Sequence, residues 1–263
     1  MSKVLVIVIR TAGTNCDKET VFAFETAGAN VELVQREKKL EDYQILAIPG
    51  GFTYGDDIAS GKILANELKF KLEEDIQKFI NDGKLIIGIC NGFQILVKAG
   101  LLPNLSGSFS TIEVTLTVND SDKFEDRWVY LKSHESQVIS HKCVWTKGIG
   151  GIIELPVAHG EGKFIPRDKD VLTQLKKENL IVFEYVDENG MRKGYPYNPN
   201  GSVENIAGIC DRTGRIFGLM PHPERHITSF QHPCWTRNRR SNHVEGDGIV
   251  IFKNGVDFAK KYL

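Results

Sequence analysis

The stretch Leu85-Ile86-Ile87-Gly88-Ile89-Cys90-Asn91-Gly92 decides the fold, because it ends an apolar run with a cysteine between two glycines. The apolar run Leu85–Ile89 is typical of a strand that is buried on both faces. The residues that follow, through Val97, read as a helix, which Gly100 closes. The sequence therefore predicts a tight strand-to-helix turn with Cys90 at its apex.

The two glycines around Cys90 indicate a reactive cysteine. In a G-x-nucleophile-x-G turn the nucleophile has a strained backbone, and its neighbours two positions away must be small to avoid the adjoining strand and helix. The turn places Cys90 at a helix N-terminus, where the helix dipole stabilises a thiolate, and the N–H of Asn91 can face a developing oxyanion. The alternative, a buried and inert cysteine, is the usual fate of a free thiol.

Segments before this turn already alternate between strand and helix. We expect strands at Val4–Ile9, Val31–Val34 and Gln44–Ile48, a helix to about Thr26 capped by Asn15 or Asp17, and a long helix from Ile58 to Ile80. Such alternation predicts an α/β fold with a mostly parallel open sheet and helices on both faces.

From about Ser106 to Val144 the pattern changes, and apolar and polar residues alternate as in antiparallel strands. We expect antiparallel strands at Ile112–Val118 and Trp128–Leu131, a helix at Asp168–Lys177, strands at Leu180–Val186, Ile206–Cys210 and Arg215–Met220, and a last helix within Asp247–Tyr262. The simplest interpretation is a single domain over residues 1–263 with an embedded antiparallel β region.

A thiol nucleophile needs a nearby imidazole, and His222 stands out because it lies between Pro221 and Pro223 after an apolar strand. The prolines favour an extended segment, in which residues i and i+2 point the same way. Glu224 can therefore hold the tautomer of His222 and stabilise the imidazolium. A strand-end histidine with a solvated glutamate is an equal alternative on spacing alone. In a parallel sheet, Cys90 and His222 would both lie at carboxyl ends of strands, where α/β active sites gather.

A second glycine turn, Pro49-Gly50-Gly51, also ends a strand. Two glycines let a peptide N–H approach a ligand closely, so Gly51 is a candidate second oxyanion donor. An ordinary turn is the better explanation when this segment is taken alone. The argument for a functional role of this turn is that it would lie at the same sheet edge as Cys90.

The charge balance narrows the classes of partner. The 263 residues include 33 basic and 34 acidic side chains, which argues against broad binding to nucleic acid or to an anionic membrane. The five cysteines are scattered and form no C-x-x-C pair, which fits a reducing compartment. The apolar N-terminal run is too short to span a bilayer, so we expect a cytoplasmic protein.

These motifs together resemble a known family. Gly88-Ile89-Cys90-Asn91-Gly92-Phe93-Gln94 resembles the G-x-C-x-G-x-Q signature of class I, triad-type glutamine amidotransferases. Pro49-Gly50-Gly51 and Pro221-His222-Pro223-Glu224 resemble its other two blocks, in order. One branch fits closely, the glutaminase subunits of phosphoribosylformylglycinamidine synthases in purine biosynthesis. Segments similar to that branch lie along nearly the whole chain: Thr14–Asp17, Gly50–Asp56, Ala158–Phe164, Tyr197–Ser202, Ile206–Ile209 and Met220–Arg225.

The details of the signature also bear on the branch. Phe93 stands where other amidotransferases commonly have histidine, which favours this branch, whereas Arg10–Gly13 departs from its pattern. The resemblance implies a flavodoxin-like amidotransferase fold.

The resemblance also implies a role for each motif residue. Cys90 would attack the side-chain amide of glutamine, His222 would shuttle protons and Glu224 would orient His222. The N–H groups of Gly51 and Asn91 would hold the oxyanion. The substrate-binding residues would be Gly50, Gly51, Asn91 and Gln94.

The implied partners are two further subunits. Ammonia would pass to a synthetase large subunit, which a small third subunit bridges to this chain. The resemblance places ATP and magnesium on the synthetase. Because the sequence has no G-x-x-x-x-G-K-[ST] loop, we expect ATP chemistry on a partner and no cofactor on this chain, and we expect no metal because no zinc-ligand spacing occurs.

Three features lie outside this assignment. The set His222, His226, His232, Cys234 and His243 matches no standard zinc spacing. The basic cluster Arg237–Arg240 is interpreted as a solvated or subunit-docking surface, because the overall charge is balanced. For the loop His159–Glu161 the resemblance implies a partner-facing or ammonia-delivery role.

Two other functions stay open at this point. The first is a cysteine hydrolase or peptidase on a similar fold, acting without a synthetase. The second is a non-catalytic regulatory module, which a glutamine-analogue electrophile would not label at Cys90.

Overall fold

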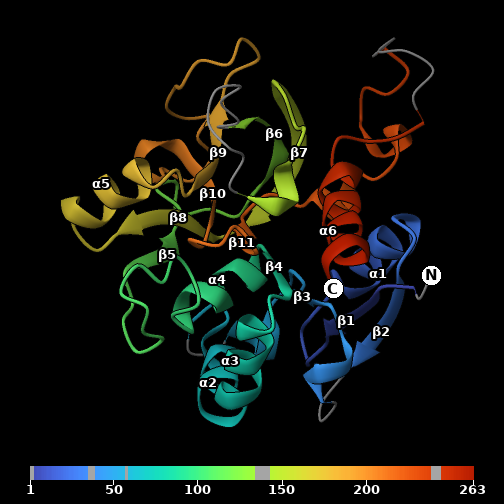
Figure 1. Cartoon of the computed structure of the whole chain (residues 1–263). Coiled ribbons are helices and arrows are strands. Elements are labelled where there is room, and N and C mark those ends of the chain that lie inside the picture. The colour runs from blue at the N-terminus through green and yellow to red at the C-terminus, as the bar shows by residue number, and fades with distance from the viewer. Residues whose placement is uncertain (1–2, 35–38, 57–58, 134–142, 238–243) are drawn as a thin grey trace.

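A computed structural model describes residues 3–34, 39–56, 59–133, 143–237 and 244–263, and its centre is a nine-stranded sheet (Figure 1). Five neighbouring strands run parallel, in the spatial order β2 (Asn30–Val34), β1 (Leu5–Ile9), β3 (Ile45–Ile48), β4 (Leu85–Ile89) and β11 (Ile216–Leu219). Four antiparallel strands extend the same sheet: β10 (Ile206–Cys210), β9 (Ile181–Val186), β6 (Glu125–Ser133) and β7 (Ile152–His159).

The register of the parallel strands brings three loops to one edge. Gly88 of β4 pairs with Ile48 of β3 on one side and with Gly218 of β11 on the other. All three strands are fully buried, as their unbroken apolar sequences predict. The loops that leave their carboxyl ends therefore start side by side.

Helices cover both faces of the sheet. α1 (Asp17–Thr26) packs against α6 (Ile249–Tyr262) on one face, where the ring of Phe24 meets that of Phe252 edge-on at 4.9 Å. α2 (Lys62–Lys71), α3 (Glu73–Asn81) and α4 (Asn91–Lys98) lie on the other face, and α2 contacts both of the others. The predicted α/β fold, with a mostly parallel sheet and helices on both faces, is confirmed.

Two local predictions about helices are wrong. The helix expected from Ile58 to Ile80 is broken at Leu72, whose backbone (φ −123°, ψ 15°) ends α2 and starts α3. The run of acidic residues that follows Leu72 favours a new N-terminus, because carboxylates stabilise the positive end of a helix. The N-cap position of the first helix is occupied by Cys16, whose side chain makes no capping hydrogen bond. Neither Asn15 nor Asp17 is the N-cap residue.

The antiparallel region is larger than the sequence suggested. β6 pairs with β7 and β9, while β5 (Val114–Val118) pairs with β8 (Glu161–Pro166) in a separate two-stranded sheet. β7 and β8 were not predicted, although every second residue of β7 is buried, and that alternation is visible in its sequence. α5 (Lys169–Lys177) follows, with Asp168 accepting from the N–H of Val171 at 2.8 Å as its cap.

The buried apolar residues form one cluster that runs from Val4 to Ala259. This continuity agrees with a single domain over residues 1–263, which stays a prediction. Within the described ranges, no helix has the length and apolar composition needed to cross a membrane.

Candidate active site

Cys90 occupies the turn between β4 and α4, and its backbone is strained. Its φ of 52° and ψ of −105° lie outside the usual regions for a residue with a side chain. A Cβ at Gly92 would lie 1.9 Å from the carbonyl oxygen of Ile48, and one at Gly88 would lie 2.6 Å from the carbonyl oxygen of Gly92. Both glycines are therefore required by backbone contacts, as the G-x-C-x-G spacing predicts.

His222 and Glu224 lie in the segment that follows β11. Nδ1 of His222 is 2.6 Å from Oε1 of Glu224, and both side chains are buried. The backbone N–H of His222 donates to the carbonyl of Pro156 at 2.8 Å, which fixes the segment against β7. In the described part of the chain, Nε2 of His222 has no hydrogen-bond partner. The Glu224 contact thus leaves Nε2 as the ring nitrogen available for proton transfer.

Gly50 marks the place where the nucleophile and the imidazole meet. A Cβ built on Gly50 would lie 2.7 Å from Cε1 of His222 and 3.3 Å from Cβ of Cys90. The two side chains therefore face the same glycine, 132 residues apart in the sequence (222 − 90). A larger residue at position 50 would displace the imidazole, so this glycine leaves the room in which Cys90 and His222 approach one another.

The electrostatics of this site favour a protonated imidazole. Burial alone would lower the pKa of His222, but the carboxylate of Glu224, the charge of Cys90 and contacts with both Cys16 and Cys90 raise that pKa well above its usual value. An imidazolium beside Cys90 stabilises a thiolate there. The arrangement is that of a thiolate–imidazolium pair oriented by a carboxylate.

The loop after β3 is fixed to the cysteine turn by hydrogen bonds. Oδ1 of Asn91 accepts from the hydroxyl of Thr53 and from its backbone N–H at 3.3 Å. Gly51 has a φ of 138°, and a Cβ there would lie 2.7 Å from the backbone nitrogen of Asn15. Only glycine fits at position 51, and the side chain of Asn91 holds that turn beside Cys90.

Gln94 connects the cysteine helix to the turn between β7 and β8. Its side-chain oxygen accepts from Nδ2 of Asn91 at 3.0 Å, and its Nε2 donates to the carbonyl of Glu161. The carbonyl of Ala158, at the other end of the same turn, accepts from the thiol of Cys90 at 3.8 Å. The turn His159–Glu161 therefore forms a wall of the site, and Gln94 braces that wall.

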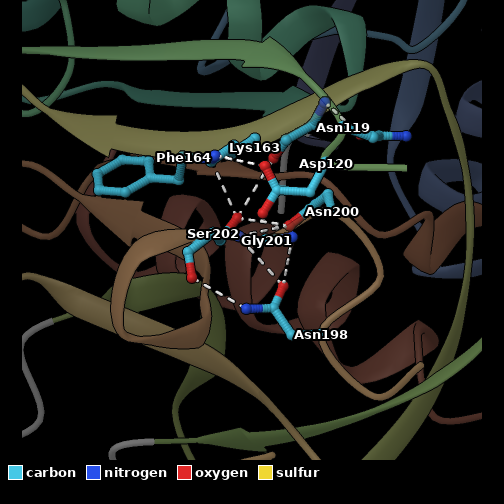
Figure 2. A network of polar contacts seen from close by, with 9 residues as sticks. Asn119, Asp120, Lys163, Phe164, Asn198, Asn200, Gly201 and Ser202 are labelled. Atoms are coloured by element: carbon cyan, nitrogen blue, oxygen red, sulfur yellow. Dashed lines mark hydrogen bonds and ion pairs between the residues drawn. The ribbon is translucent and has the colours of Figure 1, made fainter. Parts of the chain in front are cut away.

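A polar network adjoins this turn, and Figure 2 shows part of it, with Asn119 and Asn200 buried and Asp120 and Lys163 nearer the surface. The carboxamide of Asn119 accepts from the N–H of Gly162 at 3.0 Å and donates to the carbonyl of His159 at 2.8 Å. Nδ1 of His159 is 3.1 Å from Oδ1 of Asn119, and Nε2 faces Asn200. Burial, aided by the positive charge of His222, lowers the pKa of His159 to about 3, so the ring is neutral.

Sequence reasoning missed two side chains at the site. Sγ of Cys16 lies 3.9 Å from Nδ1 of His222, and the guanidinium of Arg225 donates to Sγ of Cys16 at 3.1 Å. Both residues belong to segments quoted for the family resemblance, but no local pattern indicated that they meet. The contact joins residues more than two hundred positions apart.

The histidines weighed as metal ligands have other partners. His232 contacts the carboxylate of Glu154 at 2.9 Å, and His226 contacts the carbonyl of Glu154 at 2.7 Å, with both rings against Trp128. His243 and most of the basic cluster Arg237–Arg240 lie outside the described residues.

One group of side chains does offer ligand atoms to a metal. The relevant atoms of Cys16, His222 and Glu224 all lie within 4.8 Å of one another. However, His222 and Glu224 are joined by a 2.6 Å hydrogen bond, which is shorter than two ligands of one cation normally allow. We therefore assign this group to hydrogen bonding.

The comparisons with known proteins agree with this geometry. The family model described as CobB/CobQ-like glutamine amidotransferase domain matches residues 3–259. The chain belongs to this family. Among curated members, subunit PurQ of phosphoribosylformylglycinamidine synthase from Dehalococcoides mccartyi is 47% identical, covering 99% of this chain and 100% of that protein. The PurQ subunit from Archaeoglobus fulgidus is 41% identical, with 98% of each chain covered.

Solved structures agree with this amidotransferase assignment. A chain of the structure of PurLQS from Thermotoga maritima has 32% identity and a TM-score of 0.74, covering 98% of this chain and 99% of that one. A glutamine amidotransferase from Thermotoga maritima, 14% identical with a TM-score of 0.52, covers 100% of this chain and 94% of its own, and shows the fold alone.

The structure shows a packing role for Phe93, which lies within the signature. Its ring stacks on that of Phe164 at 6.4 Å and covers Gly218, where a Cβ would lie 2.2 Å from the ring. Phe93 is therefore a core residue that ties α4 to β8 and β11.

Proposed function

We propose that this chain is the glutaminase subunit of a phosphoribosylformylglycinamidine synthase. It hydrolyses L-glutamine to glutamate and ammonia and delivers the ammonia to an ATP-dependent synthetase subunit that makes formylglycinamidine ribonucleotide. One observation carries the chemistry: an imidazole held by a carboxylate at 2.6 Å shares the space beside Gly50 with a cysteine on a strained turn. The assignment to a phosphoribosylformylglycinamidine synthase rests on the similarity to the PurQ relatives.

In the resting thiolate–imidazolium pair Nε2 of His222 already holds the proton of Cys90. In the first step the thiolate attacks the side-chain carbonyl carbon of glutamine, and the N–H groups of Gly51 and Asn91 stabilise the negative charge on the carbonyl oxygen. The 2.6 Å contact with Glu224 keeps the proton on Nδ1 and stabilises the imidazolium.

In the second step the imidazolium of His222 protonates the leaving nitrogen, and ammonia departs from the tetrahedral intermediate. A glutamyl thioester remains on Cys90. His222 then takes a proton from water, which attacks the thioester, and glutamate leaves as the thiol is restored.

The remaining assignments are part of the same proposal, and the relatives and the sequence support them. The relative from Thermotoga maritima is part of PurLQS, and we infer that this chain assembles with a synthetase subunit PurL and a small subunit PurS. ATP and magnesium belong to the synthetase, and this chain needs no cofactor of its own. The five free cysteines support a cytoplasmic location.

The test is glutamate release from glutamine by the assembled complex. Cys90→Ala should lower that rate about 10³-fold or more, because the covalent route is lost. The matched control is Cys143→Ala, which removes a buried thiol outside the site and should keep the rate. Retention of glutamate release by Cys90→Ala would overturn the proposal.

The same preparation separates the other two functions. Peptide or ester hydrolysis without glutamine hydrolysis would indicate a cysteine hydrolase. A folded wild type that a glutamine-analogue electrophile does not label at Cys90 would indicate a regulatory module.

A further inference from the structure

Cys16 and Arg225 touch the back of the candidate triad. The thiol of Cys16 is buried, its sulfur lies 3.9 Å from Nδ1 of His222, and Arg225 donates to that sulfur at 3.1 Å. A guanidinium directed at a buried sulfur is a charge-assisted contact, which is stronger and more directional than a neutral one. Arg225 follows Glu224 directly, so the contact links the histidine segment to the first loop.

The backbone of Cys16 is fixed independently of its side chain. Its N–H donates to the carbonyl of Gly50 at 3.2 Å, and its sulfur lies 3.3 Å from the position of a Cβ on Gly50. Sγ of Cys16, Cε1 of His222 and Cβ of Cys90 thus surround the same glycine. The sulfur bounds the imidazole on its Nδ1 side.

We propose that Cys16 and Arg225 form a positioning pair that holds the imidazole of His222 against Gly50 and opposite Cys90. This inference rests on the proposed glutaminase function. The backbone N–H of Cys16 contacts Gly50, which the resemblance assigns to glutamine binding, but the thiol of Cys16 and the guanidinium of Arg225 act on the imidazole of His222.

Cys16 is not a second nucleophile. Its sulfur faces Nδ1, the nitrogen that is already bonded to Glu224, and not Nε2. Burial raises the pKa of the Cys16 thiol despite the contact with His222, so the group is a neutral thiol at physiological pH.

The charge of Arg225 adds an electrostatic role. Burial would lower the pKa of Arg225, but Cys16, Glu224, Glu19 and Cys90 together raise it. The positive charge of Arg225 therefore attracts negative charge on the carboxylate of Glu224 and on the sulfur of Cys90. The charged and titratable groups around His222 are then Glu224, Cys90, Cys16, His159 and Arg225.

The experiment measures glutaminase kcat, KM and their pH dependence in the assembled complex. Cys16→Val removes the sulfur acceptor and should lower kcat about tenfold with KM within about twofold, because a displaced imidazole slows chemistry without touching substrate. Cys16→Ser keeps an acceptor and should retain most of kcat. Rescue by serine is the outcome that a purely structural role does not predict.

The arginine variants test the charge. Arg225→Met should move the acid limb of the kcat/KM profile to higher pH by about half a unit, since the thiolate loses a favourable cation. Arg225→Lys should return the acid limb of the kcat/KM profile to its wild-type pH, while kcat should recover only in part. The pH dependence of Cys90 alkylation by iodoacetamide should shift in the same direction, and it needs no turnover.

Two controls complete the test, with thermal unfolding showing that each variant folds. Cys143→Val removes a buried thiol elsewhere, and Arg167→Met removes an arginine whose partner is Asp168. If Cys16→Val and Arg225→Met are folded and match these controls in kcat and pH profile, the positioning pair is overturned. A wild type without glutaminase activity would overturn the proposed function instead, so the two failures are distinguishable.

Discussion

The parallel and antiparallel halves of the nine-stranded sheet contribute different things to the candidate site. The parallel half ends in the turns that hold Gly50, Cys90 and His222, all at one edge. The antiparallel half contributes the carbonyl of Ala158 in β7, and the adjoining two-stranded sheet of β5 and β8 contributes the carbonyl of Glu161 and the polar network around Asn119 (Figure 2). Reactive side chains thus come from one half, and the wall that confines them from the other half together with the two-stranded sheet.

The difference reflects how each half is built. In the parallel half, three short strands in register place their loops side by side, so each motif is contiguous in sequence. Beyond the antiparallel half, the wall depends on side chains such as Asn119, which follows β5 of the two-stranded sheet and bonds across forty residues. If this division is right, substitutions in the parallel half should change the chemistry, and those in the antiparallel half should change stability.

The largest expected effect is that of Glu224→Gln. The amide keeps the shape of the carboxylate but no longer stabilises an imidazolium or selects the tautomer with the proton on Nδ1 of His222. We expect kcat to fall about 10³-fold, roughly 4 kcal/mol in activation free energy, with little change in KM. Steady-state kinetics with glutamine would measure the fall in kcat. A loss below fivefold would show that the carboxylate of Glu224 does not orient His222 for catalysis.

Gly92→Ala should have the next largest effect. Alanine is about 1 kcal/mol better than glycine inside a helix, but its Cβ would lie 1.9 Å from the carbonyl oxygen of Ile48. The collision involves backbone on both sides, so we expect a net loss of about 3 kcal/mol in the free energy of unfolding.

Urea unfolding would measure the Gly92→Ala effect, and activity should fall with it because β3 and α4 are forced apart. The control is Gly194→Ala, since a Cβ there meets nothing within 4 Å. Equal stabilities of the two variants would show that the strand-to-helix turn tolerates more than its geometry indicates.

Much of the parallel half could be predicted from sequence. The buried run Leu85–Ile89 and the glycines around Cys90 placed the turn, and the spacing of His222 and Glu224 placed the pair that contact each other at 2.6 Å. These features depend on residues within a few positions of one another. Local stereochemistry predicted the turn at Cys90, whereas spacing alone left the pairing of His222 with Glu224 equal to its alternative, and the family resemblance favoured it.

The rest depends on contacts that a single sequence does not reveal. The break at Leu72 has no proline or glycine to mark it, and Cys16 reaches His222 only through the fold. His159 was noticed in its motif, but its burial and its bond to Asn119 depend on how β7 and β8 pair with other strands.

The two histidines of the site should give opposite pH dependences of stability. The pKa of His159 is about 3 in the folded protein against about 6.5 unfolded, so its contribution is lost as pH falls below 6.5. The raised pKa of His222 has the opposite sign, and its contribution is lost as pH rises through the folded value.

His159→Gln isolates the contribution of the antiparallel half. Between pH 7.5 and pH 5, wild type should lose about 2 kcal/mol of unfolding free energy through this group, and the variant should lack that loss. Chemical denaturation at both pH values is the measurement. An unchanged difference in stability would mean that His159 is solvated or protonated in the folded protein.

The smallest effect is expected at the rim of the network in Figure 2, where Lys163 pairs with Asp120. Asp120 is 61% exposed, so water and salt screen the pair, and Lys163→Met should change the unfolding free energy by less than about 0.5 kcal/mol. The buried counterpart is Ser202, whose hydroxyl accepts from the N–H of Phe164 at 3.0 Å. Ser202→Ala leaves that buried donor without its partner and should cost about 1–2 kcal/mol. Chemical denaturation compares the two variants. If Lys163→Met costs more unfolding free energy than Ser202→Ala, the exposed ion pair and not the buried hydrogen bond stabilises the wall of the site. The division of roles between the two halves of the sheet would then be wrong.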